Sequence, residues 1–136
     1  MNKKEFRDLR ITDTRSYYKP FKYAWCFDDW LRHEQSHWIH TEVPMLDDVK
    51  DWKTHLSKEQ KHFLTHIFRF FTQGDLDVAG GYVHNYLPYF PQPEVRMMLL
   101  GFAAREALHV AAYSHLIETL GMPESTYSEF LEYSEM

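Results

Sequence analysis

Residues 94–116 read EVRMMLLGFAAREALHVAAYSHL, a segment in which a few polar residues are scattered among apolar ones. Steps of three and four residues trace one face of a helix, and this face carries a carboxylate, an imidazole and a phenol between apolar residues. It consists of Leu99, Phe102, Glu106, His109, Tyr113, Leu116 and Leu120. Pro93 suits the first position of a helix and Gly121 the position after its end. We therefore predict a helix over residues 93–120.

A second long helix is predicted over residues 58–87. Ser57 and Gln60 have the spacing of a capping box, and Pro88 would stop the helix. Its core-facing side consists of Leu64, Phe68, Phe71, Asp75, Val78 and Tyr82. The five-residue link 88–92 is short enough to make the two helices an antiparallel hairpin. The sequence thus predicts an all-α fold.

The hairpin brings three metal-ligand side chains to one level. Asp75 lies about 15 residues before the middle of the link, and Glu106 and His109 lie about 16 and 19 residues after it. The heights of Asp75 and of this pair along the helix axes therefore differ by roughly 5 Å at most, which is within the reach of side chains. Glu-x-x-His places both side chains on one side of a helix. Helical bundles that hold two metal ions use a carboxylate from each of two helices and Glu-x-x-His from each of two others. This chain supplies half of that set.

The alternative to a metal site is a buried network made only of protein groups. In that network Asp75 and Glu106 would be neutralised by His109, or by an arginine such as Arg69 or Arg105. Either way, two buried carboxylates need a strong compensating partner, because burying an uncompensated carboxylate is costly.

Two further Glu/His patterns are expected to carry no metal. Glu59 and His62 fall off the apolar side of their helix, and we expect them to be solvated. The segment from His33 to His37 spells H-E-x-x-H, the pattern of zinc proteases, in which two histidines bind zinc and a glutamate acts as base. Such a site needs a third ligand and a substrate cleft, so we interpret this pattern as a chance match.

The rest of the chain is expected to be less regular. We expect an irregular N-terminal arm over residues 1–21 and a partial helical domain over residues 22–136. Within that domain the aromatic spacing of residues 22–38 is compatible with a helix, and residues 45–56 are expected to be a connection with little regular structure. Another helix is predicted to begin after Pro123.

Composition restricts the classes of function. A formal net charge of -5 does not favour binding to nucleic acid phosphates. The longest apolar run, residues 97–104, is about a third of a membrane span, and residues 1–10 lack the apolar segment of a secretory signal, so we expect a cytoplasmic protein without a membrane segment. Cys26 is the single cysteine and is expected to be a core thiol.

These motifs resemble the small, radical-generating subunit of class I ribonucleotide reductase, whose fold is a ferritin-like helical bundle. The most specific feature is an Asp followed 31 residues later by Glu-x-x-His, with a Tyr four residues after the His. The resemblance also runs through YKPFKYAW (18–25), HWIHTEVPMLDDVKDW (37–52), LTHIFRFFTQGD (64–75), residues 94–116 and GMPESTY (121–127).

The resemblance implies a role for five residues. Asp75, Glu106 and His109 would bind the first metal of a di-iron centre, or of one with manganese or mixed manganese and iron. Glu106 would bridge to the second metal. Tyr113 would be oxidised to a stable tyrosyl radical, and Trp38 would lie on the electron-transfer route to the large subunit. The implied function is to initiate reduction of ribonucleotides to deoxyribonucleotides.

The family's other three protein ligands fall beyond residue 136, so we expect an N-terminal part that is incomplete as an enzyme on its own. The implied partners are a complementary C-terminal half if the gene is split, the large subunit and a second small subunit. One alternative is a dimeric ferritin-like ferroxidase, in which two copies of the chain supply six ligands. Another is a non-catalytic helical fragment.

Overall fold

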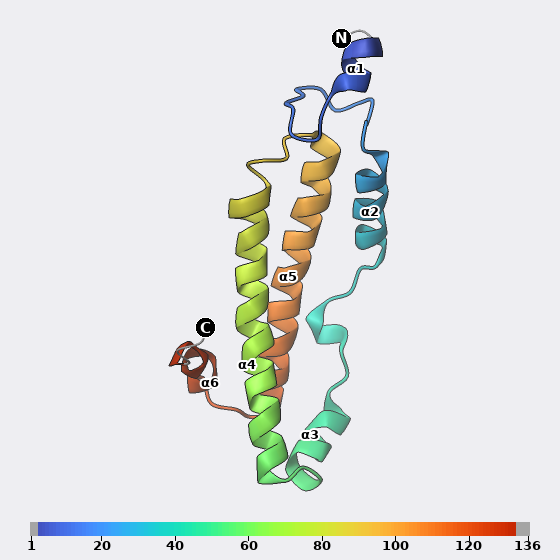
Figure 1. The fold of residues 1–136 in the computed structure, drawn as a ribbon. Coiled ribbons are helices and arrows are strands. Elements are labelled where there is room, and N and C mark those ends of the chain that lie inside the picture. Colours follow the sequence, from blue (N-terminus) through green and yellow to red (C-terminus); the bar gives the residue numbers. More distant parts are fainter. Residues whose placement is uncertain (1–2, 133–136) are drawn as a thin grey trace. The chain divides into compact units, whose positions relative to one another are not determined.

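In a computed structural model, residues 3–132 are described and every regular element among them is helical, which confirms the all-α prediction. The elements, in chain order, are α1 (Lys3–Asp8), α2 (Ala24–Gln35), the 3-10 turn η1 (His40–Glu42), α3 (Leu46–Thr54), α4 (Lys58–Gly81), the π-helical turn η2 (Tyr82–Tyr86), α5 (Pro93–Thr119), α6 (Ser125–Ser128) and the 3-10 turn η3 (Glu129–Glu132). Figure 1 shows their arrangement. Among the described residues, no helix is both long and apolar enough to cross a membrane.

The two long helices begin and end close to the predicted positions. Ser57 and Gln60 form the capping box: the Ser57 N–H donates to Gln60 Oε1 (2.8 Å), and the Gln60 N–H donates to Ser57 Oγ (3.2 Å). Gly121 has φ of 73°, and the Met122 N–H donates to the Ile117 carbonyl (3.1 Å). This is a Schellman cap, in which glycine accepts the left-handed conformation without strain.

Three stretches differ from the prediction. α4 ends at Gly81, six residues early, and the chain continues as the π-helical turn η2, because glycine is a weak helix former. The expected irregular connection over 45–56 contains α3, whose first turn carries two aspartates that favour the positive end of a helix. The expected irregular arm begins with α1.

The chain divides into two compact units, and α4 and α5 contribute to both. The first unit joins the part of the chain before Trp38 to Val78–Arg105. Cys26, Val95 and Leu99 lie in its core, so the prediction of a core thiol is confirmed, and burial raises the pKa of Cys26 to about 11. α2 approaches α5 closely at Gly101, where an added Cβ would lie 3.0 Å from Cδ1 of Trp30.

A buried carboxylate fastens the N-terminal arm to the start of α5 in this unit. Glu94 is fully buried and pairs with the buried guanidinium of Arg15. The backbone N–H groups of Lys22 and Tyr23 donate to its other oxygen at 2.9 and 3.0 Å. Gln92, also fully buried, donates its side-chain N–H to the Arg10 carbonyl (3.3 Å). The arm is therefore held by charge and hydrogen bonds despite its few helical residues.

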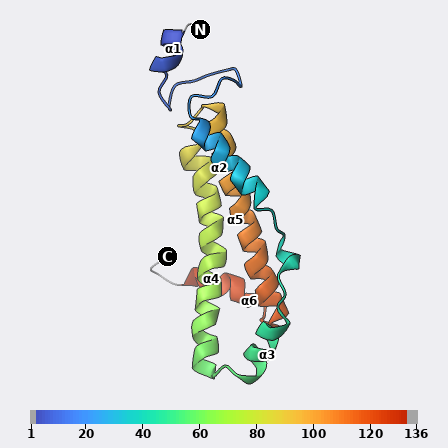
Figure 2. The ribbon, with the colours of Figure 1, turned by 90° about the vertical axis from the view of Figure 1, so that its right-hand side faces the viewer.

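The second unit joins Trp38–Asp77 to the part of the chain from Glu106 onward. In it the first part of α4 lies beside the last part of α5, as Figures 1 and 2 both show. α6 and η3 attach to this pair through the ion pair of Arg69 with Glu129 and a 2.8 Å hydrogen bond between the hydroxyls of Ser114 and Tyr127. Ile117 is buried here, with only 1% of its surface exposed.

The predicted core-facing side of α4 is only partly covered. Phe71 and Val78 are 40% and 46% exposed, so the prediction that they are buried is wrong for this chain. Periodic spacing identifies the apolar side of a helix, but it does not show what covers that side.

The buried pair of Arg15 and Glu94 predicts a large stability effect. Arg15→Met should lower the free energy of unfolding by about 3–5 kcal/mol, because it leaves a buried carboxylate without its cation. Arg10→Met is the matched control, since the pair of Arg10 with Asp13 is solvent-exposed and should barely move the transition. Urea unfolding of the full chain measures both. Equal urea midpoints for Arg15→Met and Arg10→Met would contradict the conclusion that Arg15 is the cation that compensates buried Glu94.

Candidate metal centre

Asp75 from α4 and Glu106 and His109 from α5 converge in the second unit. Each offers one ligand atom, and these atoms lie within 4.8 Å of one another. In the part of the chain that the structure describes, this is the one group of three or more such residues. The carboxylate side chains are 16% and 18% exposed and that of His109 is 40% exposed. The predicted convergence of these three residues across the hairpin is therefore observed.

The imidazole of His109 faces both acids through the same nitrogen. Its Nδ1 atom lies 3.1 Å from Oε2 of Glu106 and 3.8 Å from Oδ2 of Asp75. A protonated Nδ1 donates a hydrogen bond to Glu106, whereas a deprotonated Nδ1 directs its lone pair to the space between the carboxylates. The same three atoms can thus hold either a proton or a cation.

The electrostatics favour positive charge in this space. Burial raises the pKa of Asp75, and the nearby charge of Glu106 raises it further, whereas His109 acts in the opposite direction. The ionised form of Asp75 is therefore disfavoured unless a cation compensates it. Two carboxylates with one imidazole form a ligand set suited to iron or manganese, so the residues present fit such an ion.

The arginines proposed as alternative partners are engaged elsewhere. Arg69 pairs with Glu129 of η3. Arg105 donates to the carbonyls of His33 (2.6 Å) and Ser36 (3.3 Å) at the end of α2. The arginine version of the protein-only network is therefore wrong for Arg69 and Arg105, and among the described residues His109 is the basic group that pairs with the acids.

Tyr113 lies one helical turn after His109 on α5. Its ring is stacked on that of Phe71 from α4, with ring centroids 5.5 Å apart and planes inclined by 9°. Burial raises the pKa of the Tyr113 phenol, and the charge of Asp75 adds to this. The phenol therefore stays protonated at neutral pH, and its pKa depends on the charge of Asp75.

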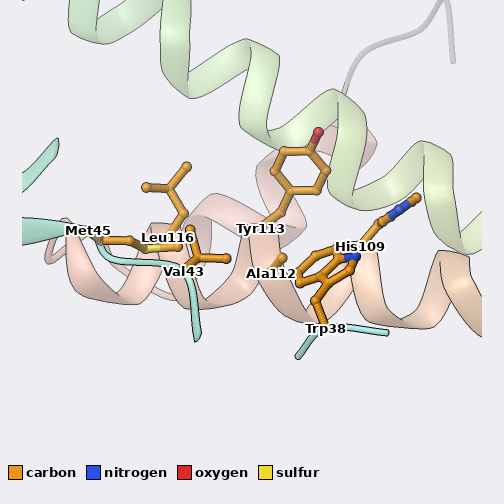
Figure 3. A pocket seen from close by; sticks show the side chains of 7 residues that line it. All are labelled: Trp38, Val43, Met45, His109, Ala112, Tyr113 and Leu116. Carbon is orange, nitrogen blue, oxygen red and sulfur yellow. The ribbon is translucent and has the colours of Figure 1, made fainter. Parts of the chain in front are cut away.

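A pocket of about 370 Å³ lies beside His109 and Tyr113 (Figure 3). Trp38 forms one side of it, and its ring is stacked beside that of His109 at 6.3 Å between centroids. The pocket is lined by Trp38, Val43, Met45, His109, Ala112, Tyr113 and Leu116. All three predicted non-acidic site residues thus share one pocket, although they come from separate parts of the sequence.

The other Glu/His patterns form no three-residue cluster among the described residues. α2 ends at Gln35, so His33 and His37 do not share a helix as a zinc-protease site requires. The ring of His33 packs instead against Phe102, at 4.7 Å between centroids. Glu59 and His62 are exposed, as expected. The sequence reasoning did not single out His66, which contacts His62, although the four-residue spacing of the two was visible.

Comparison with known proteins gives one consistent result. A family model described as "Ribonucleotide reductase, small chain" matches residues 15–136. A probable ribonucleoside-diphosphate reductase small subunit of Invertebrate iridescent virus 6 is 62% identical over 128 residues, covering 94% of this chain and 36% of the relative. The corresponding protein of Invertebrate iridescent virus 3 is 54% identical over 131 residues, covering 96% and 35%.

A more distant relative, the ribonucleoside-diphosphate reductase subunit beta of Chlamydia pneumoniae, is 31% identical over 106 residues, covering 77% of this chain and 31% of the relative. The chain therefore spans about a third of the length of the curated relatives that it matches.

The raised pKa of Asp75 predicts a pH-dependent gain in stability for Asp75→Asn. The protonated carboxyl is the form that the fold favours, so its contribution is complete below the ordinary value of 3.8 and is lost as pH rises through the raised value. Without added metal, Asp75→Asn should raise the thermal unfolding midpoint near pH 7, and the gain should disappear near pH 3.

The exposed neighbour Asp77 provides the control on the same helix, and Asp77→Asn should change the midpoint little at either pH. A lower midpoint for Asp75→Asn near pH 7 would show that the carboxylate is already compensated in the metal-free protein.

Proposed function

We propose that this chain, which belongs to the ribonucleotide reductase small-chain family, supplies half of a di-metal centre and the residue that carries a tyrosyl radical. The proposal rests on one observation above all. Asp75, Glu106 and His109 converge within 4.8 Å, and Tyr113 follows one turn later on the same helix. The assembled enzyme would use the radical to initiate reduction of ribonucleoside diphosphates, the substrate class in its relatives' names.

Asp75, Glu106 and His109 would hold the first metal ion, iron or manganese. The two carboxylates supply negative charge, and Nδ1 of His109 supplies a neutral nitrogen donor that already faces them. Binding requires this nitrogen to lose its proton, so metal affinity should fall as the solution becomes acidic. When bound, the metal centre supplies the one-electron oxidation that the side chains themselves cannot perform.

Tyr113 would be the residue that is oxidised by one electron, and its phenol would pass its proton to a base in the assembled site. The charge of Asp75 acts on this phenol, so the proton of Tyr113 is coupled to the charge of the acid cluster. The product is a neutral tyrosyl radical, and no net charge is left on the ring. The stacked ring of Phe71 would help to keep water and reductants from the phenol.

Trp38 would carry electrons between this site and the large subunit. Its ring lies beside that of His109, which supports a route that begins at the metal ligand. The remaining ligands would come from the rest of the small subunit, either in continuation of this chain or as a second polypeptide. We further propose that the complete small subunit forms a dimer.

Metal binding tests the ligand assignment. In the assembled small subunit, Asp75→Asn or Glu106→Gln should weaken Mn²⁺ binding by at least about tenfold, since each removes a charged oxygen ligand. Loss of the free-Mn²⁺ resonance signal during titration measures the affinity. Asp77→Asn, an exposed acid on the same helix, should bind like the parent. Parent-like affinity in both ligand variants would refute the site.

Electron spin resonance tests the role of Tyr113. After addition of Fe²⁺ and oxygen to the assembled small subunit, the parent should show a tyrosyl signal, and Tyr113→Phe should show none while binding equal iron. Reductase activity should fall by at least about a hundredfold, because no other step can supply the radical.

Tyr127→Phe is the matched control, because this tyrosine belongs to α6 and bonds to Ser114. It should retain the signal. A normal signal in Tyr113→Phe would remove Tyr113 from its role, whereas iron oxidation without any radical in the parent would favour the ferroxidase alternative.

A further inference from the structure

Two histidines on α4, outside the acid cluster, bring their ring nitrogens together. His62 and His66 are four residues apart and therefore share one side of the helix. Their Nε2 atoms are 3.1 Å apart, and their rings meet edge to face with centroids 4.4 Å apart. We propose that His62 and His66 bind one borderline divalent transition-metal ion, such as Cu²⁺ or Zn²⁺, through these two Nε2 atoms.

The separation of the nitrogens suits two ligands of one ion. Bonds from a metal to imidazole nitrogen are about 2.0–2.1 Å long, so two such nitrogens lie about 2.9 Å apart at a right angle and about 3.4 Å apart at a tetrahedral angle. The observed 3.1 Å falls between these values. The metal would replace the hydrogen bond that now joins the rings and would lie to one side of the line between the two nitrogens, so each ring would turn to direct a lone pair at the ion.

The surroundings of His66 favour the neutral form, which is the form that binds metal. Partial burial lowers the pKa of His66, and the charges of His62 and Arg69 lower it further, so that the ring is neutral at pH 7. Arg69 lies one turn after His66, but its charge is shared with Glu129. On the other side, Glu59 lies three residues before His62, and its carboxylate accepts a hydrogen bond from Ser57 Oγ (2.8 Å).

This pair differs from the acid cluster in position and in chemistry. His66 precedes Asp75 by nine residues on α4, which corresponds to about 13 Å along the helix axis. Its two donors are nitrogens, which copper and zinc prefer, whereas the acid cluster offers mainly oxygens, which suit manganese and iron. The inference therefore does not depend on the proposed function.

Titration of the full chain with CuCl₂ tests the site. The first equivalent should bind with two imidazole nitrogens in its electron spin resonance spectrum. His62→Gln/His66→Gln should bind copper at least about tenfold more weakly and lose that pattern, because the second imidazole acts at high effective concentration. Each single variant should lose most of the same affinity, since one imidazole cannot chelate.

The matched control removes two other exposed histidines, in His37→Gln/His84→Gln, and should bind copper like the parent. Circular dichroism establishes that helix content is equal in all variants, since glutamine is a good helix former. A first copper ion held by carboxylates, or equal affinity in the parent and His62→Gln/His66→Gln, would overturn the proposal. Neither result would affect the Mn²⁺ or radical experiments.

Discussion

The enforced proximity of two carboxylates is the constraint around which the second unit is organised. Asp75 and Glu106 project from different helices, yet a ligand atom of each lies within 4.8 Å of the other and of His109. Like charges at this spacing oppose folding unless a proton or cation intervenes. This unit must therefore be held together by other contacts, such as the burial of Ile117 on α5 and the pairing of Arg69 on α4 with Glu129 of η3. Those contacts maintain a site that is electrostatically unfavourable when empty of positive charge.

Much of the hairpin and of the acid cluster could be predicted, because the spacing of residues along a helix determines which side and which level of the helix they occupy. The hairpin fixes the level of Asp75 against Glu106 and His109, and the capping box at Ser57 fixes where α4 begins. These features depend on local rules, so sequence alone was sufficient. The placement of Tyr113 one turn beyond His109 follows from the same periodicity.

Features that depend on tertiary partners could not be predicted in the same way. α3 was missed because Leu46–Thr54 is short and strongly charged, so its apolar pattern is weak. The hydrogen bonds from Arg105 to the carbonyls at the end of α2 could not be predicted from local sequence, because these partners are about seventy residues away in the chain. The exposure of Phe71 was also missed, because an apolar stripe looks the same whether or not anything covers it.

The contacts of Glu94 with the N-terminal arm limit how far this protein can be truncated at its N-terminus. Arg15 stands at the first residue of the family match, nine positions ahead of α2. A shortened clone designed from helix boundaries would begin near Ala24 and discard the guanidinium, together with the two amides at Lys22 and Tyr23 that hold the same carboxylate. Such a product would keep every long helix and still carry an unneutralised acid in its interior. The shortest sensible fragment therefore starts ahead of Arg15.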